Sequence, residues 1–163
     1  MTELIAIAAI GKNRQIGING KLPWDIPQEY QHYQNTVRGC PLIMGRKNYE
    51  ANFEGGLIGE AFVLTRNRDY KASKGRVFFT VDEIIQALNR DKIEKAFVIG
   101  GEDVYRLFMP YVDRLMLSYV DYDGDADTFF PKFSQAEWIL KTEDQRKSYL
   151  FCEFTRAIES PSK

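Results

Sequence analysis

Short apolar runs alternate with polar segments along most of the chain. The first run, Leu4–Ile10, is continuously apolar and is followed by Gly-Lys-Asn-Arg. Such a run is typical of a β-strand that is covered on both faces. Five further runs end in the same way, at glycine or polar residues: Pro41–Met44, Ala61–Thr65, Val77–Thr80, Ala96–Ile99 and Leu115–Val120.

Helices are predicted between several of these strands. The predicted helices are Pro27–Thr36, Lys47–Phe53, Val81–Asn89 and Glu102–Phe108, and Pro110 closes the last of them. An alternation of strands and helices predicts a largely parallel sheet with helices on its faces.

After Val120 the pattern changes. An acidic loop, Tyr122–Asp127, precedes two strand candidates, Trp138–Glu143 and Tyr149–Ala157, which a polar turn separates. Consecutive strands joined by a short turn form a hairpin, so we expect an antiparallel edge on the parallel sheet. The chain is therefore predicted to form a single α/β domain over residues 1–159, followed by a short disordered tail at residues 160–163.

Charge and composition exclude several classes of function. The chain has 22 basic and 23 acidic side chains, and this balance gives no overall attraction to nucleic acid. Cys40, Cys152 and the single histidine, His32, lack the spacing of a metal site or a Cys-His nucleophile pair, so no metal is expected. Free thiols, and the absence of a signal-peptide or membrane-spanning pattern, favour a cytoplasmic protein without a membrane partner.

One carboxylate, Glu29, stands among apolar residues at the start of a predicted helix. Its neighbours include Leu22, Trp24 and Ile26. Burying an ionised carboxylate without a partner is costly, and chains that do so often use its proton chemistry. The alternative is an ordinary acidic residue in a first helical turn, where the helix dipole favours it.

Three strand ends carry groups suited to phosphate binding. In an open parallel sheet, ligands bind at the carboxyl ends of the strands. Glycine lets a backbone approach a pyrophosphate, and cations and hydroxyls can hold a further phosphate group. The groups concerned are Gly45, Arg46 and Lys47, then Thr65 and Arg66, then Gly100 and Gly101. Each taken singly is also typical of a plain turn or a solvated loop, and no G-x-G-x-x-G motif is present.

Four sequence blocks together resemble the dihydrofolate reductase family. They are IAAIGKNRQIGINGKLPWDIPQE, PLIMGR, FVIGGEDVY and DADTFFP, and their order and spacing span nearly the whole chain. The resemblance implies a mixed, mostly parallel eight-stranded sheet flanked by helices. It also implies transfer of a hydride from NADPH to C6 of 7,8-dihydrofolate, with a proton added at N5.

The resemblance further implies roles for individual residues. Glu29 corresponds to the acid that holds the pterin ring, Trp24 and Leu22 flank a water beside it, and Ser118 completes the network. Other residues implied in substrate binding are Ile7, Ala9, Tyr30, Tyr33, Leu57 and Ile99. Those implied in cofactor binding are Ala9, Ile16, Gly17, Gly20, Gly45, Arg46, Lys47, Asn48, Leu64, Thr65, Arg66, Ile99, Gly100, Gly101, Glu102, Val104, Tyr105 and Thr128.

The resemblance also implies a lid, and the chain departs from the family at three positions. The lid is Gly17–Leu22, held by Asp127. Glu29 replaces the aspartate of many bacterial members, and Asn48 replaces a threonine. Gly59 or Glu60 stands where an arginine usually grips the glutamate tail of the substrate. Two alternatives to a monomeric dihydrofolate reductase therefore stay open: a reductase of another pterin or related heterocycle, and a non-catalytic dinucleotide-binding module.

Overall fold

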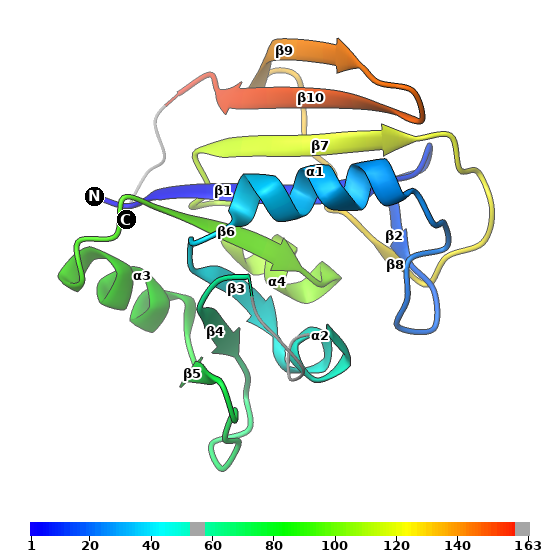
Figure 1. Ribbon diagram of the computed structural model, residues 1–163. Helices are drawn as coiled ribbons and strands as arrows, with labels where there is room; N and C mark the ends of the chain where they lie inside the picture. Colours follow the sequence, from blue (N-terminus) through cyan, green and yellow to red (C-terminus); the bar gives the residue numbers. More distant parts are fainter. Residues whose placement is uncertain (53–57, 159–163) are drawn as a thin grey trace.

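The computed structural model describes residues 1–52 and 58–158, and an eight-stranded sheet forms its centre (Figure 1). The strand order is β5-β4-β3-β6-β1-β7-β10-β9. Its strands are β1 (Glu3–Ile10), β3 (Leu42–Gly45), β4 (Ala61–Leu64), β5 (Gly75–Phe78), β6 (Lys95–Gly100), β7 (Arg114–Val120), β9 (Trp138–Gln145) and β10 (Tyr149–Arg156). All pairings from β5 to β7 are parallel, whereas β10 is antiparallel to both β7 and β9.

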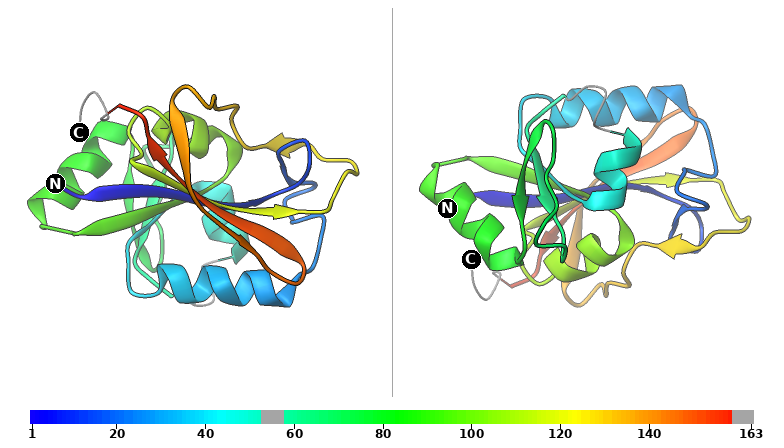
Figure 2. Two further views of the ribbon diagram at one scale, coloured as in Figure 1. Left: turned by 90° about the horizontal axis from the view of Figure 1, so that it is seen from above. Right: turned by 90° about the horizontal axis from the view of Figure 1, so that it is seen from below.

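Four helices in the described part of the chain cover the two faces of the sheet. They are α1 (Pro27–Val37), α2 (Arg46–Asn52), α3 (Val81–Arg90) and α4 (Glu102–Phe108). Alternate residues of β1 pack into different cores: Leu4 and Ala6 share a cluster with α3 and α4, whereas Ile5 and Ile7 share one with α1 and α2. Figure 2 shows α1 and α4 on opposite sides of the sheet. Both faces of β1 are therefore buried, as its uninterrupted apolar run predicts.

The predicted strands and helices all occur, with small shifts at their ends. Strand β5 (Gly75–Phe78) lies two residues earlier in the chain than the predicted strand Val77–Thr80, because Thr80 caps α3. The Thr80 hydroxyl accepts a hydrogen bond from the Glu83 amide at 3.1 Å. Phe53, predicted as the end of a helix, and the predicted tail at residues 160–163 lie outside the described residues. The domain boundary at residue 159 thus stays a prediction.

A separate two-stranded sheet was missed by the sequence analysis. It pairs β2 (Gln15–Gly17) with β8 (Thr128–Phe129) in antiparallel fashion. Strands of two or three residues are too short to show a hydrophobic period, and their pairing joins segments that are distant in sequence. Through this small sheet, the segment that follows β1 is hydrogen-bonded to the segment that follows β7 and its acidic loop.

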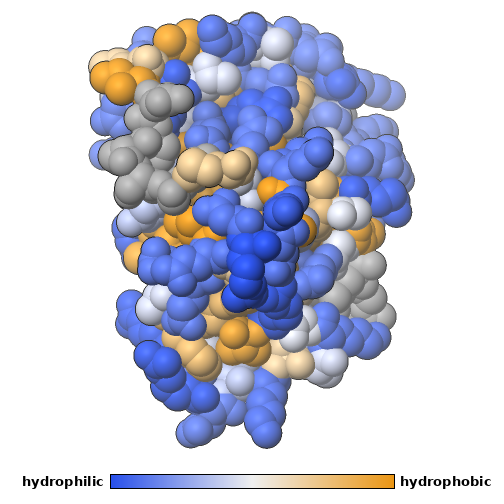
Figure 3. Space-filling view, turned by 90° about the vertical axis from the view of Figure 1, so that its left-hand side faces the viewer, coloured by the Kyte–Doolittle hydropathy of each residue, from blue (hydrophilic) through white to orange (hydrophobic). Residues whose placement is uncertain are grey.

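The surface seen in Figure 3 is largely hydrophilic, with small and separate hydrophobic patches. No helix in residues 1–52 and 58–158 is long and apolar enough to cross a membrane.

Candidate functional site

A cleft lies at the carboxyl ends of the parallel strands. Its volume is about 1170 Å³. One part, which we call the α1 half, is lined by Ile7, Ala9, Glu29, Tyr30 and Tyr33. The other, which we call the β4 half, is lined by Gly45–Asn48, Leu64–Arg66 and Phe79–Val81. The cleft therefore lies at the edge where open parallel sheets bind ligands.

Most of the residues predicted for the site line this one cleft. Besides the residues of the two halves, the predicted residues that line it are Ile16, Gly17, Gly20, Leu22, Ile99, Gly101, Glu102, Val104, Tyr105 and Thr128. Trp24, Ser118 and Gly100 are not among the lining residues, and Leu57 lies outside the described residues. Segments that are spread over the chain thus meet in one place, which local sequence patterns could not establish.

Glu29 lies at the inner wall of the α1 half. Pro27 begins α1, and Glu29 follows in the first turn with only 7% of its surface exposed. Burial raises the pKa of the Glu29 carboxyl above the ordinary 4.5, and a hydrogen bond from Ser118 opposes part of that rise. Ser118 lies on β7, paired with Ala9 of β1, so the sheet fixes this hydrogen-bond donor. The arrangement supplies one nearly desolvated carboxylate to whatever occupies the cleft.

Trp24 precedes Glu29 in the chain and carries an indole N–H donor. Its ring packs on Tyr122 at a centroid distance of 5.4 Å. Within the described residues, its buried Nε1 atom has no hydrogen-bond partner. A buried indole N–H without a partner is costly, so this atom is suited to a water or a bound ligand.

Two residues that line the cleft, Ile7 of β1 and Ile99 of β6, accept side-chain hydrogen bonds at their backbone carbonyls. The carbonyl of Ile7 accepts a hydrogen bond from the buried hydroxyl of Tyr105 at 2.7 Å. The carbonyl of Ile99 accepts one from Nδ2 of Asn48 at 3.3 Å. A carbonyl oxygen has two lone pairs, so each can accept a further donor from a ligand. The side-chain amide of Asn48 therefore forms a hydrogen bond within the protein and links α2 to β6. Asn48 stands where the resemblance leads one to expect a threonine.

The cations of the β4 half differ in how they are engaged. Arg46 forms an ion pair with Glu50 at 2.8 Å on the same helix. Lys47 and Arg66 are exposed, and no described carboxylate pairs with either of them. The Thr65 hydroxyl accepts from the Asn67 amide at 3.1 Å, which leaves its own proton available. This half therefore presents two uncommitted positive charges and a hydroxyl to a ligand.

At two glycines of the cleft wall, neighbouring side chains pack closely against the backbone. A Cβ atom on Gly17 would lie 2.7 Å from the Thr128 hydroxyl, and one on Gly45 would lie 3.3 Å from a methyl of Val104. Gly100 has φ of +114° and precedes a cis peptide bond to Gly101. Its backbone conformation favours glycine, and the turn places Gly101 on the cleft wall.

The predicted lid is connected to the loop after β7 by backbone hydrogen bonds. The Asn19 amide donates to Oδ2 of Asp127 at 2.9 Å, and the Asp127 amide donates to the Gly17 carbonyl at 3.0 Å. Asp127 thus accepts a backbone hydrogen bond from the Gly17–Leu22 segment, as the resemblance implies. Leu22 stays 49% exposed at the edge of the cleft.

Several lining residues were missed by the sequence analysis. Phe79, Thr80 and Val81 follow β5 directly. The strand-end rule that singled out the ends of β3, β4 and β6 applies equally to β5, so this signal was present in the sequence. Lys21 of the predicted lid and Asp103 of the FVIGGEDVY block also line the cleft, as do Ala51, Asn52 and Leu107, which no sequence signal marked.

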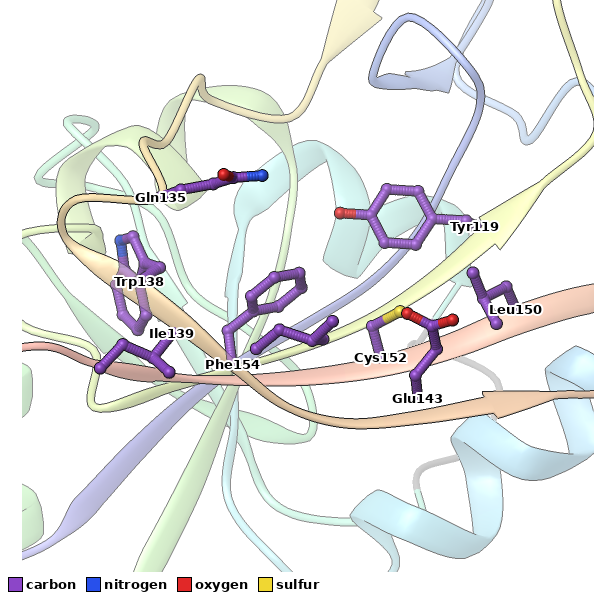
Figure 4. A pocket seen from close by; sticks show the side chains of 9 residues that line it. Tyr119, Gln135, Trp138, Ile139, Glu143, Leu150, Cys152 and Phe154 are labelled. Atoms are coloured by element: carbon purple, nitrogen blue, oxygen red, sulfur yellow. The ribbon is translucent and has the colours of Figure 1, made fainter.

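A second, smaller cavity of about 540 Å³ lies against β9 and β10 (Figure 4). Its lining is mainly apolar, with Glu143 as its one carboxylate. Burial raises the pKa of the Cys152 thiol in this cavity, and Glu143 adds to the effect, so the thiol is not activated as a nucleophile. This smaller cavity therefore offers no activated thiol.

Comparison with known proteins agrees with this geometry. The family model described as dihydrofolate reductase matches residues 3–156. The chain belongs to the dihydrofolate reductase family. It is 31% identical over 162 residues to the dihydrofolate reductase HdrB of Haloferax volcanii, covering 94% of this chain and 84% of that one. It is 28% identical over 142 residues to the Staphylococcus haemolyticus enzyme, covering 83% and 81%.

A solved member of the dihydrofolate reductase family has the same fold. The Enterococcus faecalis enzyme, complexed with NADP(H) and RAB-propyl, superposes with a TM-score of 0.85 at 27% identity and covers 96% of this chain and 97% of that one. The eight-stranded sheet predicted from the apolar runs is thereby confirmed as the sheet of this family. A dinucleotide phosphate also fits this chain, since Lys47 and Arg66 lie in the cleft without a carboxylate partner among the described residues.

Proposed function

We infer that this protein catalyses the NADPH-dependent reduction of 7,8-dihydrofolate to 5,6,7,8-tetrahydrofolate. The observation that supports this inference is the position of Glu29. Its carboxylate is 7% exposed, accepts a hydrogen bond from Ser118 and lines the cleft of a chain that belongs to the dihydrofolate reductase family. A single buried acid of this kind recognises an aminopyrimidine edge through paired hydrogen bonds and favours its protonated form.

Glu29 holds and polarises the pterin in this mechanism. Its carboxylate accepts from the ring's amino group and N3, and Ser118 keeps the carboxylate oriented. The carbonyls of Ile7 and Ile99 accept from the amino group with their remaining lone pairs. Protonation at N5 makes C6 electrophilic, and the negative charge of Glu29 stabilises that cation in a low-dielectric site.

The proton arrives through water at the edge of the cleft. The Nε1 atom of Trp24, which has no hydrogen-bond partner among the described residues, holds a water near Glu29, and the exposed Leu22 leaves a path between this position and solvent. Tyr30 and Tyr33, with ring centroids 6.0 Å apart, form a wall for the benzoyl portion of the substrate. The role of Leu57, which lies outside the described residues, stays a prediction from the sequence.

The β4 half holds the cofactor. When bound, NADPH supplies the hydride that reduces C6. Lys47, Arg66 and the Thr65 hydroxyl would hold the 2′-phosphate, with Arg46 close by, and Gly45, Asn48, Leu64 and Gly100–Tyr105 would line the pyrophosphate and nicotinamide path. Ala9, Ile16, Gly17, Gly20 and Thr128 would enclose the nicotinamide. The Gly17–Leu22 lid excludes water when it closes, and Asp127 holds it in place.

The test is oxidation of NADPH that depends on dihydrofolate, with tetrahydrofolate formed in a one-to-one ratio. Glu29→Gln is the matched variant, because it keeps the shape and removes the charge. Turnover by the native chain and its loss in a folded Glu29→Gln protein would support the proposal. A native chain that binds NADPH but reduces no dihydropterin would make it a non-catalytic dinucleotide-binding module.

A different pterin substrate is a second candidate, and the segment Gly59–Glu60 motivates it. The arginine expected there is absent, and Glu60 lies 3.5 Å from Arg76, on the β4–β5 side. Comparing dihydrofolate with other dihydropterins in the same assay separates the two candidates.

Two further expectations are part of this proposal. We expect a monomer, because the proposed site uses residues of one chain. We expect a cytoplasmic location, which the two free cysteines, Cys40 and Cys152, support.

A further inference from the structure

The predicted lid begins in the small sheet that β2 and β8 form. Gly17 is the last residue of β2 and the first residue of the Gly17–Leu22 lid, and it pairs with Thr128 of β8 (Figure 1). Both Gly17 and Thr128 line the cleft. The position of the lid base in the cleft therefore depends on what holds this small sheet in place.

The small sheet needs support from outside its own two strands. The strands have three and two residues, and a two-stranded sheet is at best marginally stable in water without further packing. The Phe130 amide donates to the Arg14 carbonyl at 2.8 Å, and the Asp127 amide donates to the Gly17 carbonyl at 3.0 Å. These two hydrogen bonds join the segments of β2 and β8 to each other, so they do not fix the pair to the wall of the cleft.

Glu102 joins β8 to the start of α4. It is the first residue of that helix, one residue after β6 ends at Gly100, and it lines the cleft. Its Oε1 atom accepts a hydrogen bond from the Phe129 amide of β8 at 2.6 Å. A hydrogen bond from a backbone amide to a carboxylate is stronger than one between neutral groups. One side chain thus connects β8 to the end of a strand in the main sheet.

The second carboxylate oxygen of Glu102 also has a partner in the protein. Oε2 lies 3.8 Å from Nη1 of Arg106, one turn later on α4, and Arg106 also pairs with Asp103. The resemblance implies that Glu102 takes part in cofactor binding, but a carboxylate repels the phosphates of a dinucleotide. Both oxygens are engaged within the chain, and this favours a structural contact over a direct contact with the cofactor.

We propose that Glu102 is a positioning residue for the lid. Its bond to Phe129 fixes β8, and through β8 the lid base at Gly17, to the wall of the cleft that holds the cofactor. With this bond in place, the lid closes over the nicotinamide and excludes water. Without it, a smaller fraction of the molecules has a closed lid, and the rate of hydride transfer falls with that fraction. This inference rests on the proposed reductase activity.

Two substitutions of Glu102 separate the hydrogen bond from the charge. Glu102→Asp keeps the charge but shortens the side chain by about 1.5 Å, so the carboxylate no longer reaches the Phe129 amide. Glu102→Gln removes the charge but keeps an oxygen that can accept this hydrogen bond. At saturating NADPH, Glu102→Asp should lower the single-turnover rate of hydride transfer about tenfold or more, and Glu102→Gln by less than about threefold.

The opposite order of the two variants would overturn the proposal. A loss of less than about threefold in Glu102→Asp, or a loss in Glu102→Gln as large as that in Glu102→Asp, would show that the bond to Phe129 does not position the lid. The Kd for NADPH, measured by fluorescence, provides a second criterion. Binding weakened about tenfold or more in Glu102→Gln would show that this side chain contacts the cofactor directly, and the proposal would be wrong.

Hydrogen exchange of the Phe129 amide tests the contact independently of activity. Exchange should be about tenfold faster in Glu102→Asp and close to the native rate in Glu102→Gln. Asp103→Ala is the matched control, because it removes a neighbouring carboxylate that pairs with Arg106 and should leave this exchange unchanged. Unchanged exchange in Glu102→Asp would contradict this inference alone, whereas a native chain that reduces no dihydrofolate would contradict the proposed function.

Discussion

The α1 half of the cleft holds one carboxylate that is 7% exposed, whereas the β4 half holds Lys47 and Arg66, both in contact with solvent. A buried charge acts in a low-dielectric environment, so a single group has a large effect on a bound ring. Exposed cations are screened, and several are needed to hold one phosphate. We therefore expect the chemistry to depend mainly on one residue, Glu29, and cofactor binding to be shared among several.

The largest effect should come from removing the buried charge. Glu29→Gln is expected to lower kcat by about 10²- to 10⁴-fold, because a neutral amide cannot stabilise the protonated pterin. Single-turnover rates and circular dichroism measure the loss of hydride transfer and the retention of the fold. Full activity of Glu29→Gln at neutral pH would contradict the assignment of the chemistry to the buried carboxylate.

Charge removal in the β4 half should have a smaller and selective effect. Lys47→Ala or Arg66→Ala should each weaken NADPH binding by about tenfold to a hundredfold and leave NADH binding nearly unchanged. Lys71→Ala, an exposed lysine that does not line the cleft, is the matched control. Equal weakening for both cofactors would show that these cations do not meet the 2′-phosphate.

The buried carboxylate should also reduce stability at neutral pH. Because the pKa of Glu29 is raised in the folded state, its ionisation destabilises the fold as pH rises through that pKa. Glu29→Gln should therefore raise the free energy of unfolding by about 0.5–2 kcal/mol at pH 8. Urea titrations from pH 4 to 8 should show this gain shrinking as the pH falls. A gain independent of pH would point to packing instead.

The smallest expected effect concerns His32, three residues after Glu29 on α1. Its ring packs on Phe151 at 4.4 Å, and within the described residues its buried Nε2 has no hydrogen-bond partner. Burial lowers the pKa of His32, Arg146 adds to this, and Asp144 and Glu153 oppose it. Folding favours the neutral imidazole of His32. Its contribution to the free energy of unfolding is therefore complete above about pH 6.5 and is lost as the pH falls through the lowered pKa.

The measurement for His32 is the free energy of unfolding at pH 5 and pH 7 in the native chain and in His32→Leu. We expect the variant to lose less stability on acidification, by no more than about 0.5 kcal/mol, because the ring is partly open to solvent. Identical pH dependence in both proteins would mean that His32 is not held neutral.

Local patterns were sufficient for the helices and for the strands of the main sheet, but not for β2 and β8. Apolar runs predicted the eight strands of the main sheet, and Gly, Pro and polar residues marked their ends. The strand-end rule brought out Arg46, Lys47 and Arg66 without any knowledge of the structure. It was not applied after β5, and Phe79, Thr80 and Val81 were missed for that reason.

Three features depended on contacts between distant residues. The hydrogen bond from the Asn19 amide to Asp127 joins residues 108 positions apart in the sequence, next to the sheet of β2 and β8. Asn48 could have faced a ligand, yet its amide reaches the carbonyl of Ile99. Gly59 could have been a plain turn residue, yet the carbonyl of Cys40 excludes any side chain there.

By itself, the sequence determined the order of strands and helices and which residue types stand at each strand end, because these follow from periodicity and from backbone preferences of neighbouring residues. Only the tertiary structure decided that Glu29 is buried against Ser118 and that Lys47 and Arg66 stay free of described carboxylates. Burial and pairing depend on which segments the fold brings together, and no local pattern contains that information.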